Sequence, residues 1–372
     1  MTSTTGGTGG GSTGGSGTGG SGTGEPGAGW CVGLLTGGGD CPGLNAVLRA
    51  AVLAGTQRHG MRFLGFRDGW RGVLDGDAVP LGEADVRPLL ARGGTVLGSS
   101  RTNPLAGGVE QGVQRVRASM ARLGVDALLA IGGEDTLGVA TALHEAGVPV
   151  VGAPKTIDDD LSATDATFGF DTAVQTAVEA CDRLVTTGAS HHRVMLVEVM
   201  GRHAGWIALH TGTAAGAHVT LLPEDPVDLD AVAATLREVI GRGEAPLVVL
   251  SEGAQVLGEQ ALRTAERDAF GHVQLGGAGE QLQRALTERL PGVSMRLTVL
   301  GHLLRGGTPS AADRVLATRF GLSAVTALAT GDLGTMAALR GVEVVQVPLA
   351  EATGVLRTVP AERRAETAGL SW

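Results

Sequence analysis

The sequence is organised around residues 127–160, ALLAIGGEDTLGVATALHEAGVPVVGAPKTIDDD. An apolar run at 127–131 breaks at Gly132 and Gly133, and a helical and a short strand-like segment then lead to a second loop, 154–160. This pattern predicts a β-α-β unit. In an open parallel sheet, both loops leave the carboxyl ends of their strands at the edge where such folds bind ligands. One loop carries glycines and two acids, and the other carries a lysine, a threonine and three acids.

The rest of the chain continues the alternation of strands and helices. Apolar runs predict strands at 30–35, 61–66, 193–200, 218–222, 247–250 and 294–300. Predicted helices occupy 46–58, 109–123, 229–240 and 280–290, and a last long helix ends near residue 330. Strands that alternate with helices of ten or more residues indicate a largely parallel α/β fold. A length of 372 residues favours two lobes.

Composition limits the class of protein. Residues 1–28 are almost entirely Gly, Ser and Thr, so they cannot bury enough apolar surface to fold and are predicted to form a flexible tail. The formal net charge of -9 and an aromatic content of 3% argue against nucleic-acid binding. The three cysteines show no CxxC spacing, and no run of 18 apolar residues occurs. We therefore expect a soluble, cytoplasmic protein.

Most predicted strands end in glycine together with a charged residue. These charged residues are Asp40, Arg101, Glu134, Asp135, Lys155, Asp158, Arg202, Glu252, His302 and Arg305. Arginine binds phosphate in a bidentate manner, and Mg²⁺ prefers one or two carboxylates plus phosphate oxygens, so the mixture favours a phosphorylated ligand with a divalent cation. Each motif taken singly also has a structural explanation, as a tight turn, a helix cap or a surface loop.

Six motifs in order resemble the 6-phosphofructokinase family over most of residues 30–340. They are GGGDCPGLNA at 37–46, GGEDT at 132–136, PKTIDDD at 154–160, VEVMGRHAG at 197–205, SEG at 251–253 and GHLLRGGTPSAADR at 301–314. The resemblance implies a two-lobed α/β enzyme that transfers a phosphoryl group to O1 of fructose 6-phosphate with Mg²⁺. It implies a donor lobe at 29–169 that is completed by about 304–350, a sugar-phosphate lobe at 170–303 and a C-terminal segment at 351–372.

The resemblance also implies roles for single residues. Donor contacts would come from Gly38 and Arg101, and the acid associated with Mg²⁺ would be Glu134. The catalytic loop would contain Asp158 as the base, Asp160 as a second acid, and Thr156 and Ile157 as substrate contacts. Further sugar-phosphate contacts would come from Met200, Gly201, Arg202, Glu252, His302, Leu303, Leu304 and Arg305. The family supplies Arg193 and Arg296 from a neighbouring subunit, which implies a homodimer or homotetramer with shared active sites.

Asp159 departs from the family pattern, because relatives commonly have Asn at this position. Three successive carboxylates repel one another, and a neighbouring like charge raises the pKa of a carboxyl group. The charge state of the loop is therefore an open question at the level of sequence, although Lys155 and Mg²⁺ would both offset the repulsion.

Asp135 and Lys155 predict the phosphoryl donor. Members of the family that use pyrophosphate resemble this chain at both positions, whereas ATP-using members usually have Gly after the metal acid. A carboxylate at Asp135 would repel and displace the α-phosphate of ATP, which is specificity by exclusion, and Lys155 would stabilise the departing phosphate. We therefore predict a reversible pyrophosphate-dependent enzyme of glycolysis and gluconeogenesis.

Four alternatives remain at this stage. In the first, Asp135 is only the cap of a helix that begins at Thr136. In the second, the phosphoryl donor is ATP. In the third, the protein is a sugar-phosphate sensor without turnover, although such a sensor should have lost Asp158 or Glu134. In the fourth, the protein binds NAD or FMN, which would require the GxGxxG turn and distal acid that this sequence lacks.

Overall fold

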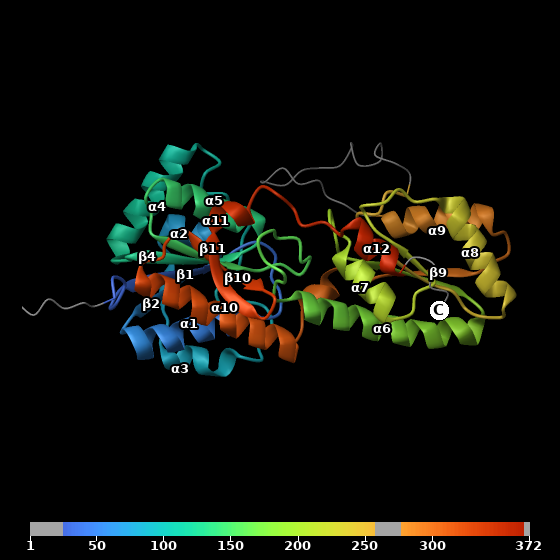
Figure 1. The fold of residues 1–372 in the computed structure, drawn as a ribbon, viewed down its shortest axis with the longest axis horizontal. Coiled ribbons are helices and arrows are strands. Elements are labelled where there is room, and N and C mark those ends of the chain that lie inside the picture. Colours follow the sequence, from blue (N-terminus) through green and yellow to red (C-terminus); the bar gives the residue numbers. More distant parts are fainter. Residues whose placement is uncertain (1–24, 257–276, 368–372) are drawn as a thin grey trace, which may run out of the picture.

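The computed structural model describes residues 25–256 and 277–367, which form two lobes that each contain one sheet (Figure 1). The strands of the first sheet are β1 (Cys31–Thr36), β2 (Arg62–Phe66), β3 (Ala78–Pro80), β4 (Ala127–Gly132), β5 (Val150–Pro154), β10 (Thr335–Arg340) and β11 (Glu343–Pro348). Their order across the sheet is β11-β10-β5-β4-β1-β2-β3. The five central strands run parallel, and only the edge strands β3 and β11 pair in the antiparallel direction.

Helices cover both faces of this first sheet. The helices of this lobe are α1 (Leu44–His59), α2 (Trp70–Asp75), α3 (Glu83–Val86), α4 (Val109–Leu123), α5 (Glu134–Glu145), α10 (Ala311–Thr330) and α11 (Leu349–Ala352), with the short 3-10 helix η1 (Arg87–Leu89). Apolar side chains of α1, α3 and α10 form the core on one face, and those of α2, α4, α5 and α11 form the core on the other (Figure 1).

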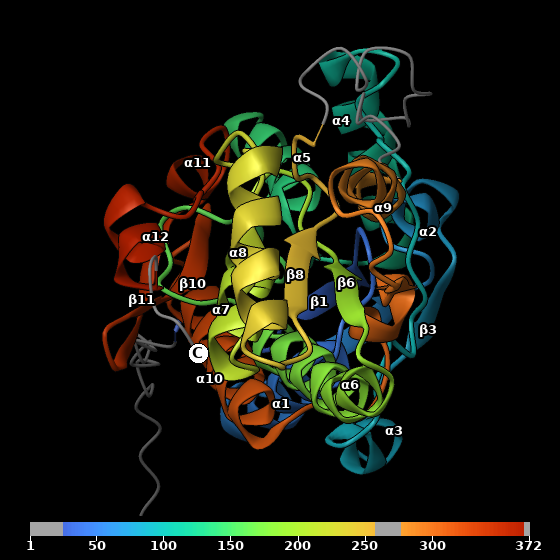
Figure 2. The ribbon, with the colours of Figure 1, turned by 90° about the vertical axis from the view of Figure 1, so that its right-hand side faces the viewer.

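The second lobe repeats this arrangement around a smaller, fully parallel sheet of order β7-β8-β6-β9. Its strands are β6 (Val194–Val199), β7 (Val219–Leu221), β8 (Leu247–Ser251) and β9 (Met295–Val299). Its helices are α6 (Phe170–His191), α7 (Trp206–Ala214), α8 (Leu229–Gly241), α9 (Ala278–Arg289) and α12 (Ala361–Thr367), with the 3-10 helix η3 (Gly301–Arg305). Helices α8 and α9 lie on one face of the sheet, and α6 and α7 lie on the other (Figure 2).

The sequence produces the fully buried central strands because they are apolar apart from Thr36 in β1, Glu198 in β6 and Ser251 in β8. Every residue of β1, β4, β5, β6 and β8 is buried. A strand that is covered by helices on both faces loses the alternation of polar and apolar residues and appears as a continuous apolar run. The result is that each central strand delivers its following loop to one edge of its sheet.

The two lobes are joined where α6 and α10 begin. The carboxylate of Asp313 is buried and accepts hydrogen bonds from the backbone N–H and the hydroxyl of Thr172, at 2.9 Å and 2.5 Å. The backbone N–H of Ser310 donates to the Thr172 hydroxyl at 2.9 Å. These bonds satisfy donors at the start of both helices, and α6 continues from this junction into the second lobe (Figure 1).

The predicted α/β class is confirmed, and the predicted central strands and helices are present within a few residues. The helix predicted to be last is not the last element, since it is followed by the β10–β11 hairpin, α11 and α12. This prediction failed because β11 lies at an edge of the sheet and is only partly buried. The long helix α6 and the short elements α2, β3 and α3 were not predicted.

The predicted flexible tail requires a correction at its end. Residues 1–24 lie outside the described residues, but Gly27 is buried and its N–H donates to the carbonyl of Ala329 at 2.9 Å. Glu25 pairs with His59 at the end of α1. Glycine is required at position 27 because a Cβ atom there would overlap the carbonyl of Leu328. Among the described residues, no helix is long and apolar enough to cross a membrane.

Candidate active site

One pocket collects residues from loops that follow strands of both lobes. Its lining residues are Gly38, Gly39, Trp70, Ser100, Arg101, Thr102, Gly133, Glu134, Asp135, Thr136, Lys155, Thr156, Asp158, Asp160, Arg202, His203, Glu252, Arg305 and Leu356. The contributing loops follow β1, β4 and β5 of the first sheet and β6 and β8 of the second. The carboxyl ends of both parallel sheets thus supply one site, as expected for open α/β folds.

The structure brings together eleven of the residues predicted from sequence. These eleven are Gly38, Arg101, Glu134, Asp135, Lys155, Thr156, Asp158, Asp160, Arg202, Glu252 and Arg305. Cations and carboxylates therefore alternate around one cavity, which is the combination expected for a phosphorylated ligand that binds together with a metal ion.

Eight predicted residues do not line this pocket. They are Ile157, Arg193, Met200, Gly201, Arg296, His302, Leu303 and Leu304. The side chains of Ile157, Met200 and Leu304 are buried in the hydrophobic core, so they pack the loops rather than point into the cavity. Gly201 has a φ of 136°, and a Cβ there would lie 2.7 Å from the carbonyl of Ala204, so this glycine is required by the turn itself.

Several lining residues were missed by the sequence reasoning. Most are neighbours of predicted positions, namely Gly39, Ser100, Thr102, Gly133, Thr136 and His203. Trp70 and Leu356 are different, because they lie outside every motif and no local signal marks them. Trp70 begins α2, and Leu356 belongs to the chain between α11 and α12, so only the folded structure brings them to the site.

Asp158 has the features of a proton acceptor. Its backbone N–H donates to the hydroxyl of Thr156 at 3.0 Å, which fixes the turn that presents its side chain. Its Oδ1 is buried and has no hydrogen-bond partner among the described residues. Burial raises the pKa of Asp158, whereas Arg305, Lys155 and other nearby cations lower it. An unpaired carboxylate oxygen in a pocket can accept the proton of a bound hydroxyl group.

Lys155 links the loop that follows β5 to the glycine turn that follows β1. The side chain is only 3% exposed, and Nζ donates to the carbonyl of Gly39 at 2.5 Å. A Cβ atom on Gly38 would lie 3.3 Å from this Nζ, so the ammonium group sits directly against the turn. Burial lowers the pKa of Lys155, and Asp158 and Asp160 counteract this effect.

Glu134 and Asp135 form the first turn of α5 and both line the pocket. The helix is capped by Gly133 and contains no side-chain capping bond, so the interpretation of Asp135 as the N-cap of a helix beginning at Thr136 is wrong. The positive end of the helix dipole stabilises acids in a first turn. Oε1 of Glu134 accepts a weak hydrogen bond of 3.3 Å from the N–H of Gly354.

Asp159 does not line the pocket, although its two neighbours do. Its carboxylate is 4% exposed, forms an ion pair of 2.6 Å with Arg357, and accepts hydrogen bonds from the N–H and hydroxyl of Thr167. Burial raises the pKa of Asp159, and Arg357 and Thr167 lower it. The repulsion expected between three successive acids is thus reduced, because the middle one points away and has its own counterion.

Asp160 carries an electrostatic penalty in the loop. Burial, followed by the charge of Asp158, raises the pKa of Asp160 to about 7. Glu252, on the opposite lobe, also has a raised pKa, because of burial and the charge of Asp158. The pocket therefore contains carboxyl groups that are stabilised by the arrival of positive charge.

The carboxylates present fit Mg²⁺ that arrives with a phosphorylated ligand. Glu134, Asp135, Asp158 and Asp160 line the same cavity. Within the described ranges, no three His, Cys, Asp or Glu side chains are arranged to hold a metal ion by themselves. Mg²⁺ ordinarily uses one or two carboxylates and completes its shell with water and phosphate oxygens, so this donor set suits it.

Known proteins resemble this chain over most of its length. Residues 31–328 match the family model described as phosphofructokinase. A pyrophosphate--fructose 6-phosphate 1-phosphotransferase of Amycolatopsis methanolica is 61% identical over 90% of this chain and 98% of its own. ATP-dependent 6-phosphofructokinase 3 of Streptomyces coelicolor is 51% identical over 90% and 98%. The crystal structure of a pyrophosphate-dependent phosphofructokinase from Nitrosospira multiformis has a TM-score of 0.78 at 22% identity, over 89% of this chain and 86% of its own, which shows the shared fold.

The raised pKa of Asp160 predicts a pH-dependent stability. Between about pH 4 and pH 7 the folded protein binds a proton that the unfolded chain releases, so stability decreases as the pH rises through this interval. Asp160→Asn removes the buried charge, and we expect it to stabilise the metal-free and ligand-free protein by about 2 kcal/mol at pH 8, with a smaller gain near pH 5.

The measurement is thermal unfolding of both proteins in EDTA across this pH range. Glu145→Gln, at an exposed acid of the same lobe, is the matched control and should give no such difference. A gain in stability that is equal at pH 5 and pH 8 would contradict the assignment.

Proposed function

The chain belongs to the phosphofructokinase family, and we propose that it transfers a phosphoryl group from pyrophosphate to O1 of fructose 6-phosphate, reversibly, giving fructose 1,6-bisphosphate and phosphate. The observation that carries this proposal is the position of Asp135 and Lys155 in the pocket beside the glycine turn. The relative that is 61% identical bears the name of this activity. The decisive experiment compares pyrophosphate and ATP as donors with purified protein and fructose 6-phosphate.

The proposed mechanism assigns the proton transfer to Asp158. Its unpaired oxygen accepts the proton of the sugar hydroxyl as that hydroxyl attacks the donor phosphorus. Arg202 and Glu252 come from the second lobe and orient the sugar, and Arg305 binds its phosphate. Glu134 would hold Mg²⁺, and the cation would supply neutralisation of the charge on the transferred group. Phosphoryl transfer has a loose transition state, so positioning and neutralisation supply most of the catalysis.

Asp135 and Lys155 support pyrophosphate over ATP. Asp135 places a carboxylate at the start of α5, where it repels and displaces a donor that continues beyond its second phosphate. Lys155 holds its ammonium group against Gly38 and Gly39, where it stabilises the phosphate that leaves. A nucleotide donor requires open space where Asp135 stands.

We propose that active sites are shared between subunits of a homodimer or homotetramer. Arg193 and Arg296 lie outside the pocket of their own chain, and Arg296 is exposed on β9, an edge strand of the second sheet. Val299 and Leu303 near this edge are 54% and 68% exposed, which is typical of a surface that another subunit covers. His302 is exposed on the same segment.

The proposed location is the cytoplasm. Cys31, Cys41 and Cys181 are buried as free thiols, and a reducing compartment preserves such thiols. Burial raises the pKa of Cys41 to about 12, so this thiol stays protonated although it lies close to Lys155.

Asp158→Asn tests the proposed base. We expect turnover to decrease by roughly 10²–10⁴-fold, the usual contribution of a general base, because Asn cannot accept the proton. The KM for fructose 6-phosphate should change far less, since Asn keeps the shape of the side chain. Steady-state kinetics with pyrophosphate measure both constants, and unchanged turnover would remove Asp158 from this role.

Asp135→Gly and Lys155→Gly test the donor. The parent protein should use pyrophosphate with little activity on ATP. Asp135→Gly should raise kcat/KM for ATP at least partly, because it removes the charge and volume that exclude the α-phosphate. Lys155→Gly should damage the use of pyrophosphate most. Robust turnover with ATP and none with pyrophosphate in the parent would refute the proposal.

Mixed oligomers test the shared site. Arg296→Ala and Asp158→Asn should each be nearly inactive alone. Subunit exchange should restore part of the activity, because a mixed oligomer contains sites in which an intact Asp158 meets an intact Arg296 from the neighbour. Activity is measured on mixtures whose exchange is verified by mass. Complete absence of complementation in such mixtures would mean that each site is built from one chain.

A further inference from the structure

The chain between α11 and α12, residues 353–360, crosses from the first lobe to the second, and we call it the C-terminal strap (Figure 1). On the first lobe, Leu356 forms an isolated antiparallel β-bridge with Leu161 and lines the pocket. On the second lobe, the N–H of Val359 donates to Oε1 of Glu224 at 2.9 Å. The strap therefore contacts both lobes beside the active site, and none of the proposed catalytic groups belongs to it.

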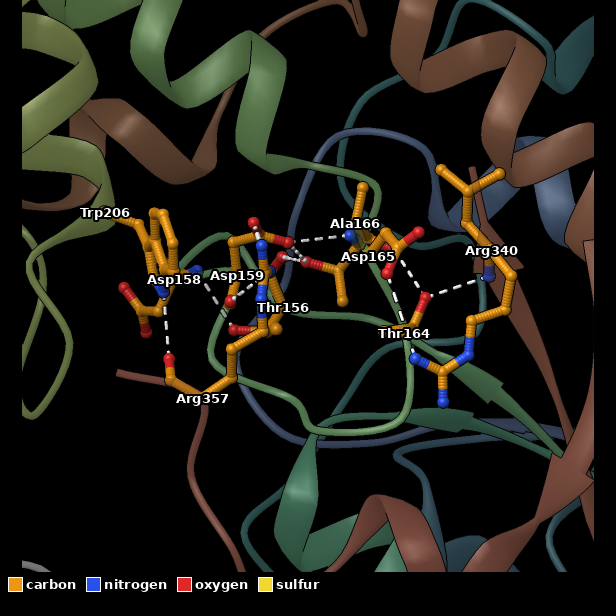
Figure 3. A network of polar contacts seen from close by, with 11 residues as sticks. Thr156, Asp158, Asp159, Thr164, Asp165, Ala166, Trp206, Arg340 and Arg357 are labelled. Carbon is orange, nitrogen blue, oxygen red and sulfur yellow. Dashed lines mark hydrogen bonds and ion pairs between the residues drawn. The ribbon is translucent and has the colours of Figure 1, made fainter. Parts of the chain in front are cut away.

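Arg357 is the residue of the strap that contacts the catalytic loop. Its backbone N–H donates to the carbonyl of Asp160 at 2.8 Å. Its Nη1 donates both to the carbonyl of Asp159 at 2.9 Å and to the Asp159 carboxylate at 2.6 Å (Figure 3). The loop is thus held through two successive residues, and both follow Asp158 directly.

Arg357 is also fixed to the second lobe through Trp206. The guanidinium carbon lies 4.5 Å from the centre of the indole ring, within the range of cation–π contacts. The indole Nε1 donates to the carbonyl of Arg357 at 2.9 Å (Figure 3). Trp206 begins α7, directly after the turn that carries Arg202 and His203. One arginine therefore connects the loop that bears Asp158 to the lobe that bears the sugar-binding residues.

Asp159 requires this partner because of its backbone conformation and burial. Its φ is 52°, in the left-handed region where Asp and Asn are tolerated better than most residues. In this conformation its carboxylate points into the loop, where Thr167 binds it while the Thr167 hydroxyl also donates to the carbonyl of Thr156 at 2.7 Å. A buried carboxylate that loses its cation is strongly unfavourable, so the loop would have to rearrange to solvate it.

We propose that Arg357 is a positioning residue for phosphoryl transfer: it neutralises the buried Asp159 and thereby holds the turn that aims Asp158 at the substrate hydroxyl. The proposal rests on the proposed role of Asp158 as base. Arg357 touches no reacting atom in this scheme. Its effect should appear in turnover, because a displacement of about 1 Å at a reacting group can reduce a rate about 10²-fold.

Arg357→Met and Asp159→Asn, singly and together, test this proposal. Arg357→Met keeps an extended side chain but leaves Asp159 without a counterion, and we expect kcat to fall between about 10-fold and 100-fold with KM changed by less than about threefold. Asp159→Asn keeps the left-handed conformation and removes the charge, so its kcat should stay within about threefold of the parent. The double variant should recover kcat to within about tenfold of the parent, since no buried charge remains unpaired.

Arg364→Met is the matched control. Arg364 lies seven residues after Arg357, in α12. Its side chain is 25% exposed against 27% for Arg357, and it pairs with Asp225 at 2.9 Å rather than with the catalytic loop. All kinetics are measured well below the thermal unfolding temperature of each variant. Arg364→Met should lower that temperature but leave kcat within about twofold of the parent.

Three outcomes would overturn the proposal. The first is parental kcat in folded Arg357→Met, which would make Arg357 only a structural link. The second is a double variant no more active than Arg357→Met. The third concerns the case in which Arg357→Met does not fold. The double variant must then fold and keep kcat within about tenfold of the parent. Its failure to do so would count against the proposal. Absence of pyrophosphate-dependent turnover in the parent would instead refute the proposed function, so the two failures are distinguishable.

Discussion

Neutralising buried charge at the junction of the two lobes is the constraint on which the active site depends. Asp158, Asp159 and Asp160 are consecutive, and burial raises the pKa of all three. The chain separates them by a single left-handed residue, Asp159, so that the middle carboxylate faces Arg357 while its neighbours face the pocket. Without that turn, three carboxylates would compete for the same cations, and the loop would not remain compact.

The framework around this loop is built from fully buried, largely apolar strands. Because β1, β4 and β5 are covered on both faces, their ends are fixed, and the loops that follow them converge at one edge of the sheet. The second sheet brings its own loops to the same pocket. Asp313 binds the start of α6 from the first turn of α10, so the orientation of the lobes is coupled to a buried hydrogen-bonded carboxylate. The C-terminal strap adds a second connection on the far side of the loop.

Sequence reasoning predicted most of the central strands, the glycine turns and eleven pocket residues, because these features are local and carry strong patterns. It could not predict that Asp159 turns away from the pocket, since that depends on an arginine almost 200 positions later and on a backbone angle. Trp70 and Leu356 were missed because only the folded chain brings them to the pocket. Strand β11 was missed because an exposed edge strand lacks the continuous apolar run that identified the others. Strand β10 is a central strand, but it offers only the short apolar run 336–339. Ile157, Met200 and Leu304 belong to the predicted motifs but pack in the core, so motif membership did not distinguish contact from support.

The two kinds of charge in this site have different energetic roles. Asp159 has its cation in the folded chain, so its neutralisation belongs to folding and is present before any ligand binds. Asp158, Asp160 and Glu252 have raised pKa values because burial, and for Asp160 and Glu252 also the charge of Asp158, exceeds the effects that lower their pKa. Their neutralisation therefore depends on what enters the pocket, and a cation that arrives with a phosphorylated donor relieves the repulsion most. The empty pocket lowers the free energy of unfolding, and this loss is recovered as binding free energy when a ligand enters. The ion pair between Arg357 and Asp159 holds the loop in place both with and without the ligand. That division explains why the loop can contain an uncompensated base and still be rigid enough to position it.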